Sequence, residues 1–241
     1  MPDIFSPEIL VSLATLTLLE IVLGIDNVIF ISIVAGRLAK EQRIVARRWG
    51  LGGALVLRVL FLLSIVWIIG LKNPLFALFG VAFSWRDIIL IAGGLFLLVK
   101  ATLEIHDNLE GLERETAPKL FPGGPMLSVV LQIMLLDIVF SIDSILTAIG
   151  LSQVLWVMIT AIVISMAIML WASEPLSAFI DRHPTVKMLA LAFLILIGMA
   201  LVADGFDFHI PRAYLYFAVS FSLLVEALNI TYRKKRRPDG A

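Results

Sequence analysis

The chain has 241 residues, of which 60% are hydrophobic and 16% are charged, and its mean hydropathy is +1.01. This composition excludes an ordinary soluble domain and is typical of a polytopic membrane protein. The formal net charge is +0 and the chain has no cysteine, which excludes a disulfide framework, a thiolate metal site and thiol redox chemistry.

Seven stretches are predicted to be transmembrane helices, because a helix needs about 20 consecutive apolar residues to cross a bilayer. They cover residues 9–35, 46–69, 88–103, 126–151, 154–172, 186–202 and 214–231. Pro175 follows the fifth stretch and is expected to end that helix. The short apolar connection at 74–84 is interpreted as an interfacial turn. The sequence therefore predicts an all-α polytopic fold with seven transmembrane helices.

Basic residues are distributed unevenly between alternate loops. One set of loops carries Arg37, Lys40, Arg43, Arg47, Arg48, Arg114, Lys119, Arg182, Lys187 and the basic run at 233–237. The other set carries only Lys72, Arg86 and Arg212. Because cytoplasmic loops are enriched in Lys and Arg, we predict that the N-terminus lies outside and the C-terminus lies in the cytoplasm.

A twelve-residue motif occurs twice, once in the first predicted span and once in the fourth. The first copy reads LLEIVLGIDNVI and the second reads LLDIVFSIDSIL, with six of twelve positions identical. Glu20 corresponds to Asp137, and Asp26 corresponds to Asp143. An acid within a membrane span costs about 2.5–3.5 kcal/mol on insertion scales, so four acids at matched positions need a common explanation. We interpret them as the walls of an ion site.

The predicted topology makes this repeat an inverted one, because the first and fourth spans would cross the membrane in opposite directions. Gly94 in the third span and Gly198 in the sixth span are a second, weaker correspondence between the two halves. We therefore predict a single membrane domain with two halves, at about 9–105 and 126–205, and an extra helix at about 214–231. Such folds hold substrate near the bilayer midplane, at the interface between the repeats.

The spacing within each motif has a geometric consequence. Six residues correspond to about 240° of rotation on an ideal helix, so Glu20 and Asp26 do not share a face. For both acids to face one ion, the helix must bend or unwind near Gly24, where the absence of a side chain makes this easier. Ser141 holds the equivalent position and can bend its helix by bonding to the preceding turn. A broken helix would also free backbone carbonyls as ligands.

Each motif continues with a neutral oxygen side chain, Asn27 in the first copy and Ser144 in the second. Together with the acids these residues form an all-oxygen ligand set, which suits Mn²⁺, Mg²⁺ or Ca²⁺ better than soft metals. Four carboxylates around one divalent ion leave excess negative charge. Some of them would be protonated or paired with Lys100, so an exchange of metal for protons is a natural coupling.

Other interpretations of these charges remain open at this point. The acids could instead be buried structural partners of Arg58 and Lys100. Arg58 either balances the acids or extends its charged end to the membrane surface. Lys100 either reaches the acids and replaces the cation, or pairs with Glu104 one turn away. Glu226 in the last span is either a proton-coupling site or a headgroup-level residue.

Four segments resemble the TerC family of integral membrane proteins: LLEIVLGIDNVIFIS, MLLDIVFSIDSILTAIGL, RHPTVKMLALAFLILIG and IPRAYLYFAVSFSLLVEALN. The resemblance covers nearly the whole chain and is to the short branch, without cytoplasmic regulatory domains. It implies a bacterial plasma-membrane protein related to the lysine-exporter superfamily, in which several members export manganese. The family's acidic positions match Glu20, Asp26, Asp137 and Asp143. Asp204 lies where close relatives often carry a bulkier acidic segment, which argues against a role for it.

The function expected from the residues and the resemblance is export of a divalent cation, Mn²⁺ first, by proton exchange. One alternative is an exporter of a cationic organic solute, and another is a membrane scaffold that supplies metal to secreted proteins. An enzyme is not expected, because no nucleophile and base occur at a usable spacing. The expected partners are the transported ion and the lipid bilayer, with no tightly bound cofactor and no nucleic acid. The sequence leaves a homo-oligomer open.

Overall fold

The computed structural model describes residues 6–64, 74–78, 81–110, 124–151 and 154–236. The elements in these residues are α1 (Pro7–Leu23), α2 (Ile25–Gly36), α3 (Lys40–Leu63), β1 (Pro74–Leu78), β2 (Val81–Ser84), α5 (Trp85–Leu109), α6 (Pro125–Leu151), α7 (Leu155–Arg182), α8 (Pro184–Gly205) and α9 (Arg212–Arg236). Within these residues, six helical segments are long and apolar enough to cross a membrane, with α1 and α2 forming one of them. The predicted all-α polytopic membrane fold is thereby confirmed.

The second predicted span corresponds to α3, which is not among those six segments. Arg47, Arg48 and Arg58 lie within its otherwise apolar part and lower its apolar character. Residues 65–69 of the predicted span lie outside the described residues. The expected interfacial turn contains the antiparallel strands β1 and β2, which pair from Pro74 with Ser84 to Leu78 with Val81.

The helix predicted to end at Pro175 does not end there. α7 continues through this proline to Arg182, so that expectation was wrong. A proline removes one helical N–H and usually kinks or ends a helix. Here polar groups support the preceding turn: the Ser173 hydroxyl donates to the Leu170 carbonyl at 2.8 Å, and Arg47 Nη1 donates to the Ser173 carbonyl at 3.2 Å.

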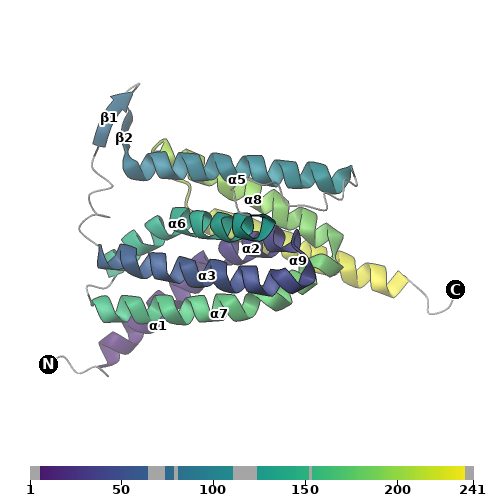
Figure 1. The fold of residues 1–241 in the computed structure, drawn as a ribbon, viewed down its shortest axis with the longest axis horizontal. Helices are drawn as coiled ribbons and strands as arrows, with labels where there is room; N and C mark the ends of the chain where they lie inside the picture. Colours follow the sequence, from purple (N-terminus) through teal and green to yellow (C-terminus); the bar gives the residue numbers. More distant parts are fainter. Residues whose placement is uncertain (1–5, 65–73, 79–80, 111–123, 152–153, 237–241) are drawn as a thin grey trace.

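α5 and α8 form the most extensive helix pair, and they lie together along one side of the bundle (Figure 1). Their backbones meet at two glycines: a Cβ on Gly94 would lie 2.6 Å from the Gly198 carbonyl oxygen, and one on Gly198 would lie 3.0 Å from the Gly94 carbonyl oxygen. Small residues at such a crossing allow close packing of membrane helices. On the other side of the bundle, α3 packs against α6 and α7, and α7 also contacts α1 and α2.

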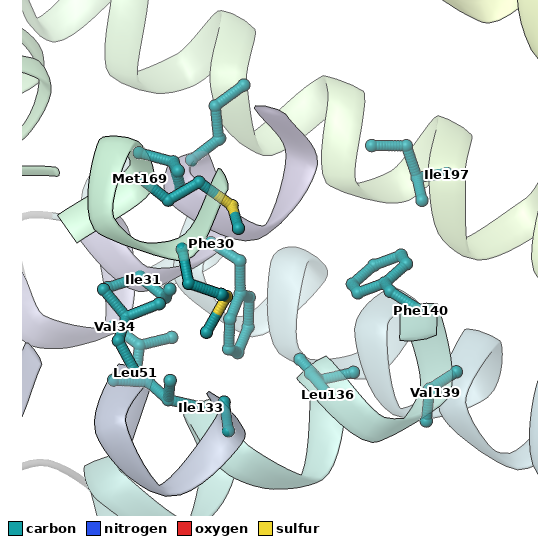
Figure 2. Close-up of a cluster of buried hydrophobic side chains, with 14 of the residues drawn as sticks. Phe30, Ile31, Val34, Leu51, Ile133, Leu136, Val139, Phe140, Met169 and Ile197 are labelled. Carbon is teal, nitrogen blue, oxygen red and sulfur yellow. The ribbon is translucent and has the colours of Figure 1, made fainter. Parts of the chain in front are cut away.

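The buried core lies between these layers, where side chains from α2, α3, α6, α7 and α8 converge (Figure 2). Phe30, Leu136 and Phe140 belong to it and are each at most 4% exposed. Leu136 precedes Asp137 in the chain, so one of the acids of the repeated motif lies directly beside this apolar cluster. By contrast, no residue between Arg212 and Tyr232 on α9 is buried. Among the other elements, the main contact of α9 is with α8.

Candidate functional site

Two acids from the repeated motif meet at one arginine in the middle of the bundle. Arg58 on α3 donates from Nη1 to Glu20 Oε2 at 2.7 Å. It binds Asp137 on α6 through two bonds, from Nε to Oδ2 at 2.8 Å and from Nη2 to Oδ1 at 2.7 Å. The three residues are 1%, 2% and 3% exposed for Glu20, Arg58 and Asp137 respectively. The residues that the repeat makes equivalent are therefore bridged by one guanidinium.

Asn27 on α2 extends this cluster, because its Nδ2 donates to Asp137 Oδ1 at 3.1 Å. Two oxygen atoms of the cluster, Glu20 Oε1 and Asn27 Oδ1, are buried and have no hydrogen-bond partner among the described residues. A buried acceptor without a partner costs about 1–3 kcal/mol. Both atoms are hard oxygen donors of the kind that Mn²⁺, Mg²⁺ and Ca²⁺ accept. The cluster thus has unused coordination capacity.

Gly24 separates the two halves of the first motif. Its backbone stays in the right-handed region, with φ −88° and ψ −6°. The Gly24 N–H donates to the Glu20 carbonyl at 2.9 Å, and the Val28 N–H donates to the Gly24 carbonyl at 3.1 Å. The helix is therefore interrupted at the residue where the sequence predicts a bend, but the Glu20 carbonyl keeps a backbone donor and is not freed as a ligand.

Asp26 lies on the other side of this interruption and does not join the arginine. It is 6% exposed and lines a cavity of about 20 Å³ together with Asp204 and Arg212. Arg212 is close enough to interact electrostatically with Asp26. Asp204 Oδ1 accepts the Ile210 N–H at 3.4 Å and lies 3.1 Å from His209 Nδ1. This cavity therefore contains two acids and one arginine.

A second cavity, also of about 20 Å³, is lined by Phe30, Lys100, Glu104 and Gln132 among other residues. Lys100 lines this cavity and not the one that contains Asp26. Glu104 pairs with Arg37 and, at 3.6 Å, with Lys187 Nζ. Gln132 Nε2 donates to the Ser128 carbonyl at 2.9 Å, whereas its buried Oε1 has no partner among the described residues.

The remaining site candidates form hydrogen bonds with other residues, or their side chains lie outside the described residues. The Ser144 hydroxyl is buried and donates to the Ser141 carbonyl at 3.3 Å. Glu226 on α9 accepts hydrogen bonds from Thr185 at the start of α8 and, at 3.3 Å, from Asn229. Asp143 belongs to α6, but its side chain lies outside the described part of the structure. Within that part, no group of three or more His, Cys, Asp or Glu side chains could hold a metal ion by itself.

Sequence reasoning identified the acids but did not assign Arg58 to both of them. The available signal was an arginine with no adjacent acid inside an otherwise apolar segment, ALVLRVLFLLS. Arg212 was counted only as a loop charge, although it follows Asp204 by a short loop. An acid and an arginine at the two ends of one short loop were the available signal for the cavity that both residues line.

No solved structure matches the chain. Among curated proteins, the chain is 50% identical to the UPF0053 inner membrane protein YgdQ of Escherichia coli K12, over 96% of this chain and 97% of the relative. It is 48% identical to a UPF0053 protein of Haemophilus influenzae, again over 96% and 97%. The UPF0053 inner membrane protein YoaE of Escherichia coli K12 is longer, and the 47% identity covers 97% of this chain but 45% of YoaE.

The family model described as "Integral membrane protein TerC family" matches residues 5–239. This match spans nearly all of the bundle, including both acid motifs and α9. The chain therefore belongs to the TerC family of integral membrane proteins.

Proposed function

We propose that this protein is a secondary transporter that exports a divalent metal cation, with Mn²⁺ as the first candidate, from the bacterial cytoplasm in exchange for protons. The observation that carries the proposal is the convergence of Glu20 and Asp137 on Arg58. Two carboxylates at repeat-equivalent positions are costly inside a membrane, and such residues commonly mark ion pathways. The inner-membrane names of the relatives support a location in the plasma membrane.

The two cavities flank the cluster along two helices, which supports a pathway that reaches it from both sides. Along α6, Gln132 lines one cavity and Phe140 the other, with Asp137 between them. Along α2, Phe30 and Asp26 divide in the same way around Asn27. Each cavity has a volume of about 20 Å³, enough for about one water molecule. This size favours a single ion over a cationic amino acid, which is the competing substrate.

The charges of the buried cluster explain how a metal ion could be exchanged for protons. Glu20 and Asp137 carry two negative charges, and Arg58 neutralises one of them. If Arg58 withdraws, the two carboxylates are neutralised equally by one divalent ion or by two protons. In this mechanism Arg58 is the internal cation that competes with the transported one, while Asn27 Oδ1 and Glu20 Oε1 supply further oxygen ligands. Asp26, Asp143 and Ser144 extend the ligand set along the pathway.

We also propose that α3 crosses the membrane as well, which brings the number of spans to seven. In this arrangement the two halves form an inverted repeat, and the N-terminus lies outside. The contacts support this pairing: α1 and α2 pack on α7 just as α6 packs on α3, and the equivalent glycines of α5 and α8 meet each other. Because the chain has no cysteine, single cysteines can be placed by Glu41→Cys and Asp207→Cys. A membrane-impermeant maleimide added to intact cells should label only the cysteine of Asp207→Cys. Labelling of only the Glu41→Cys variant would show that the orientation is the opposite one.

The test of transport is Mn²⁺ flux into proteoliposomes under an imposed pH gradient. We expect flux in the wild type and its loss in Asp26→Asn and in Asp143→Asn. The matched control is Asp181→Asn, an equivalent change at an exposed acid that pairs with Arg43 at 2.8 Å. A folded wild type without Mn²⁺ flux would exclude the manganese proposal. Flux of a cationic amino acid would then favour the solute exporter, and no flux of either substrate would favour the metal-supplying scaffold.

A further inference from the structure

A groove far larger than the two cavities near the acids lies between α3 and α7. Its volume is about 310 Å³, and Arg47, Arg48, Trp171 and Glu174 are among its lining residues. It is close to the first turns of α3, at the end of the bundle that the distribution of basic loops predicts to be cytoplasmic. A volume of this size is in the range of small-molecule sites rather than of single ions.

Arg47 forms the inner wall of this groove. The residue is only 6% exposed, and its Nη1 donates to the Ser173 carbonyl at 3.2 Å. That bond is the only one that the structure gives for its guanidinium within the described residues, so further N–H donors of this buried cation remain available. Glu174 lines the same groove and interacts electrostatically with Arg47, so it offsets part of the positive charge there.

Arg48 and Trp171 form the outer rim. Arg48 is exposed and makes no hydrogen bond or ion pair within the part of the chain that the structure describes, unlike Arg43, which pairs with Asp181. Trp171 is 77% exposed. Tryptophan is enriched where membrane proteins meet lipid headgroups. The rim thus combines an uncompensated positive charge with an interfacial aromatic ring.

These features define the ligand chemistry. Two arginines against one glutamate give the groove a net charge of +1, and a guanidinium can bind two phosphate oxygens at once. Ile44 and Leu170 add apolar wall beside the charges. Basic pockets between membrane helices on the cytoplasmic side are suited to anionic headgroups. We propose that this groove binds the phosphate headgroup of an anionic phospholipid, with Arg47 and Arg48 on the phosphate and Trp171 beside the glycerol region.

The experiment uses native mass spectrometry of the full-length protein in detergent, titrated with phosphatidylglycerol or with phosphatidylcholine of the same acyl chains. We expect tighter binding of phosphatidylglycerol in the wild type. Arg48→Gln should weaken that binding about fivefold, the effect of one basic residue at a membrane surface, and leave phosphatidylcholine binding unchanged. Because Arg48 is exposed, its substitution leaves the packing of the bundle intact. Lys40→Gln is the matched control, since it removes an exposed charge from the same helix outside the groove.

Other outcomes would overturn the assignment. Equal binding of the two lipids, or equal weakening by Lys40→Gln, would mean that general surface charge attracts the lipid. Competition by inorganic phosphate at concentrations comparable to the lipid would identify a soluble phosphate site. The proposal is independent of the transport mechanism, because loss of lipid selectivity in Arg48→Gln is measured without a transported ion.

Discussion

The two acid motifs have six of twelve residues in common, yet their backbones and surroundings differ. The first motif is divided by Gly24 between α1 and α2, whereas the second lies within the continuous helix α6. Glu20 accepts one bond from Arg58, while Asp137 accepts two from Arg58 and a third from Asn27. The same sequence pattern therefore produces one sparsely bonded and one well-bonded carboxylate.

The neighbouring helices explain the difference. At Gly24 a Cβ would lie 2.3 Å from Met169 Sδ, because α7 packs closely on this turn. At the equivalent position in α6, Ser141 is buried and its hydroxyl donates to the Ile138 carbonyl at 3.0 Å. Arg58 on α3 also has no counterpart on α7, which has no charged residue before Glu174. A duplicated motif retains its acids while each copy adapts its backbone to different packing.

The largest expected effect concerns the single arginine that serves both acids. Arg58→Met leaves Glu20 and Asp137 as buried carboxylates without their counter-charge, which should destabilise the fold by about 3–5 kcal/mol. Thermal unfolding in detergent checks this. Arg48→Met is the control, because Arg48 is exposed and makes no hydrogen bond or ion pair within the described residues, so its substitution should cost about 0.5 kcal/mol or less. Similar losses in both variants would contradict a special role for the buried cluster.

An intermediate effect should separate the two acids from each other. Asp137→Asn disturbs a carboxylate with three hydrogen bonds, and Glu20→Gln one with a single hydrogen bond. Since hydrogen bonds to charged groups contribute about 1.5–3 kcal/mol, Asp137→Asn should destabilise the protein more, by about 2 kcal/mol or above. Unfolding free energies of both variants, compared at one pH, provide the measurement. Equal losses would mean that the two motifs are energetically equivalent.

The smallest effect concerns the residues in the middle of the motifs. Gly24→Ala forces the Met169 side chain to move and should cost about 1–3 kcal/mol as an overpacking change. Ser141→Ala removes one hydroxyl bond and should cost about 1 kcal/mol or less. Unfolding measurements on Gly24→Ala with and without Met169→Ala identify the cause. If Gly24→Ala costs as much in the Met169→Ala background as in the wild type, the cost arises from the backbone and not from the contact with methionine.

Hydropathy predicts the helices well, because burial in lipid depends on long apolar runs that the sequence displays directly. The predicted span 126–151 differs from α6 by one residue at its start, and the interruption at Gly24 follows from its missing side chain. The continuation of α7 past Pro175 could not be predicted, since it coincides with a polar contact from Arg47 on another helix. The bridge from Arg58 to both acids is likewise a long-range contact, separated by 38 and 79 residues in the chain.

These two separations have a consequence for biosynthesis. The ribosome completes Glu20 before Arg58, and it reaches Asp137 only 79 residues later. A buried arginine is costly in a bilayer, and α3 is less apolar than the helices on either side. Glu20 is therefore the only one of its two partners already synthesised when α3 leaves the translocon. If α3 spans the bilayer as proposed above, we expect α1 to α3 to insert as a hairpin in which Glu20 pairs with Arg58. We expect Asp137 to add its two bonds to Arg58 only later, once α6 has been inserted.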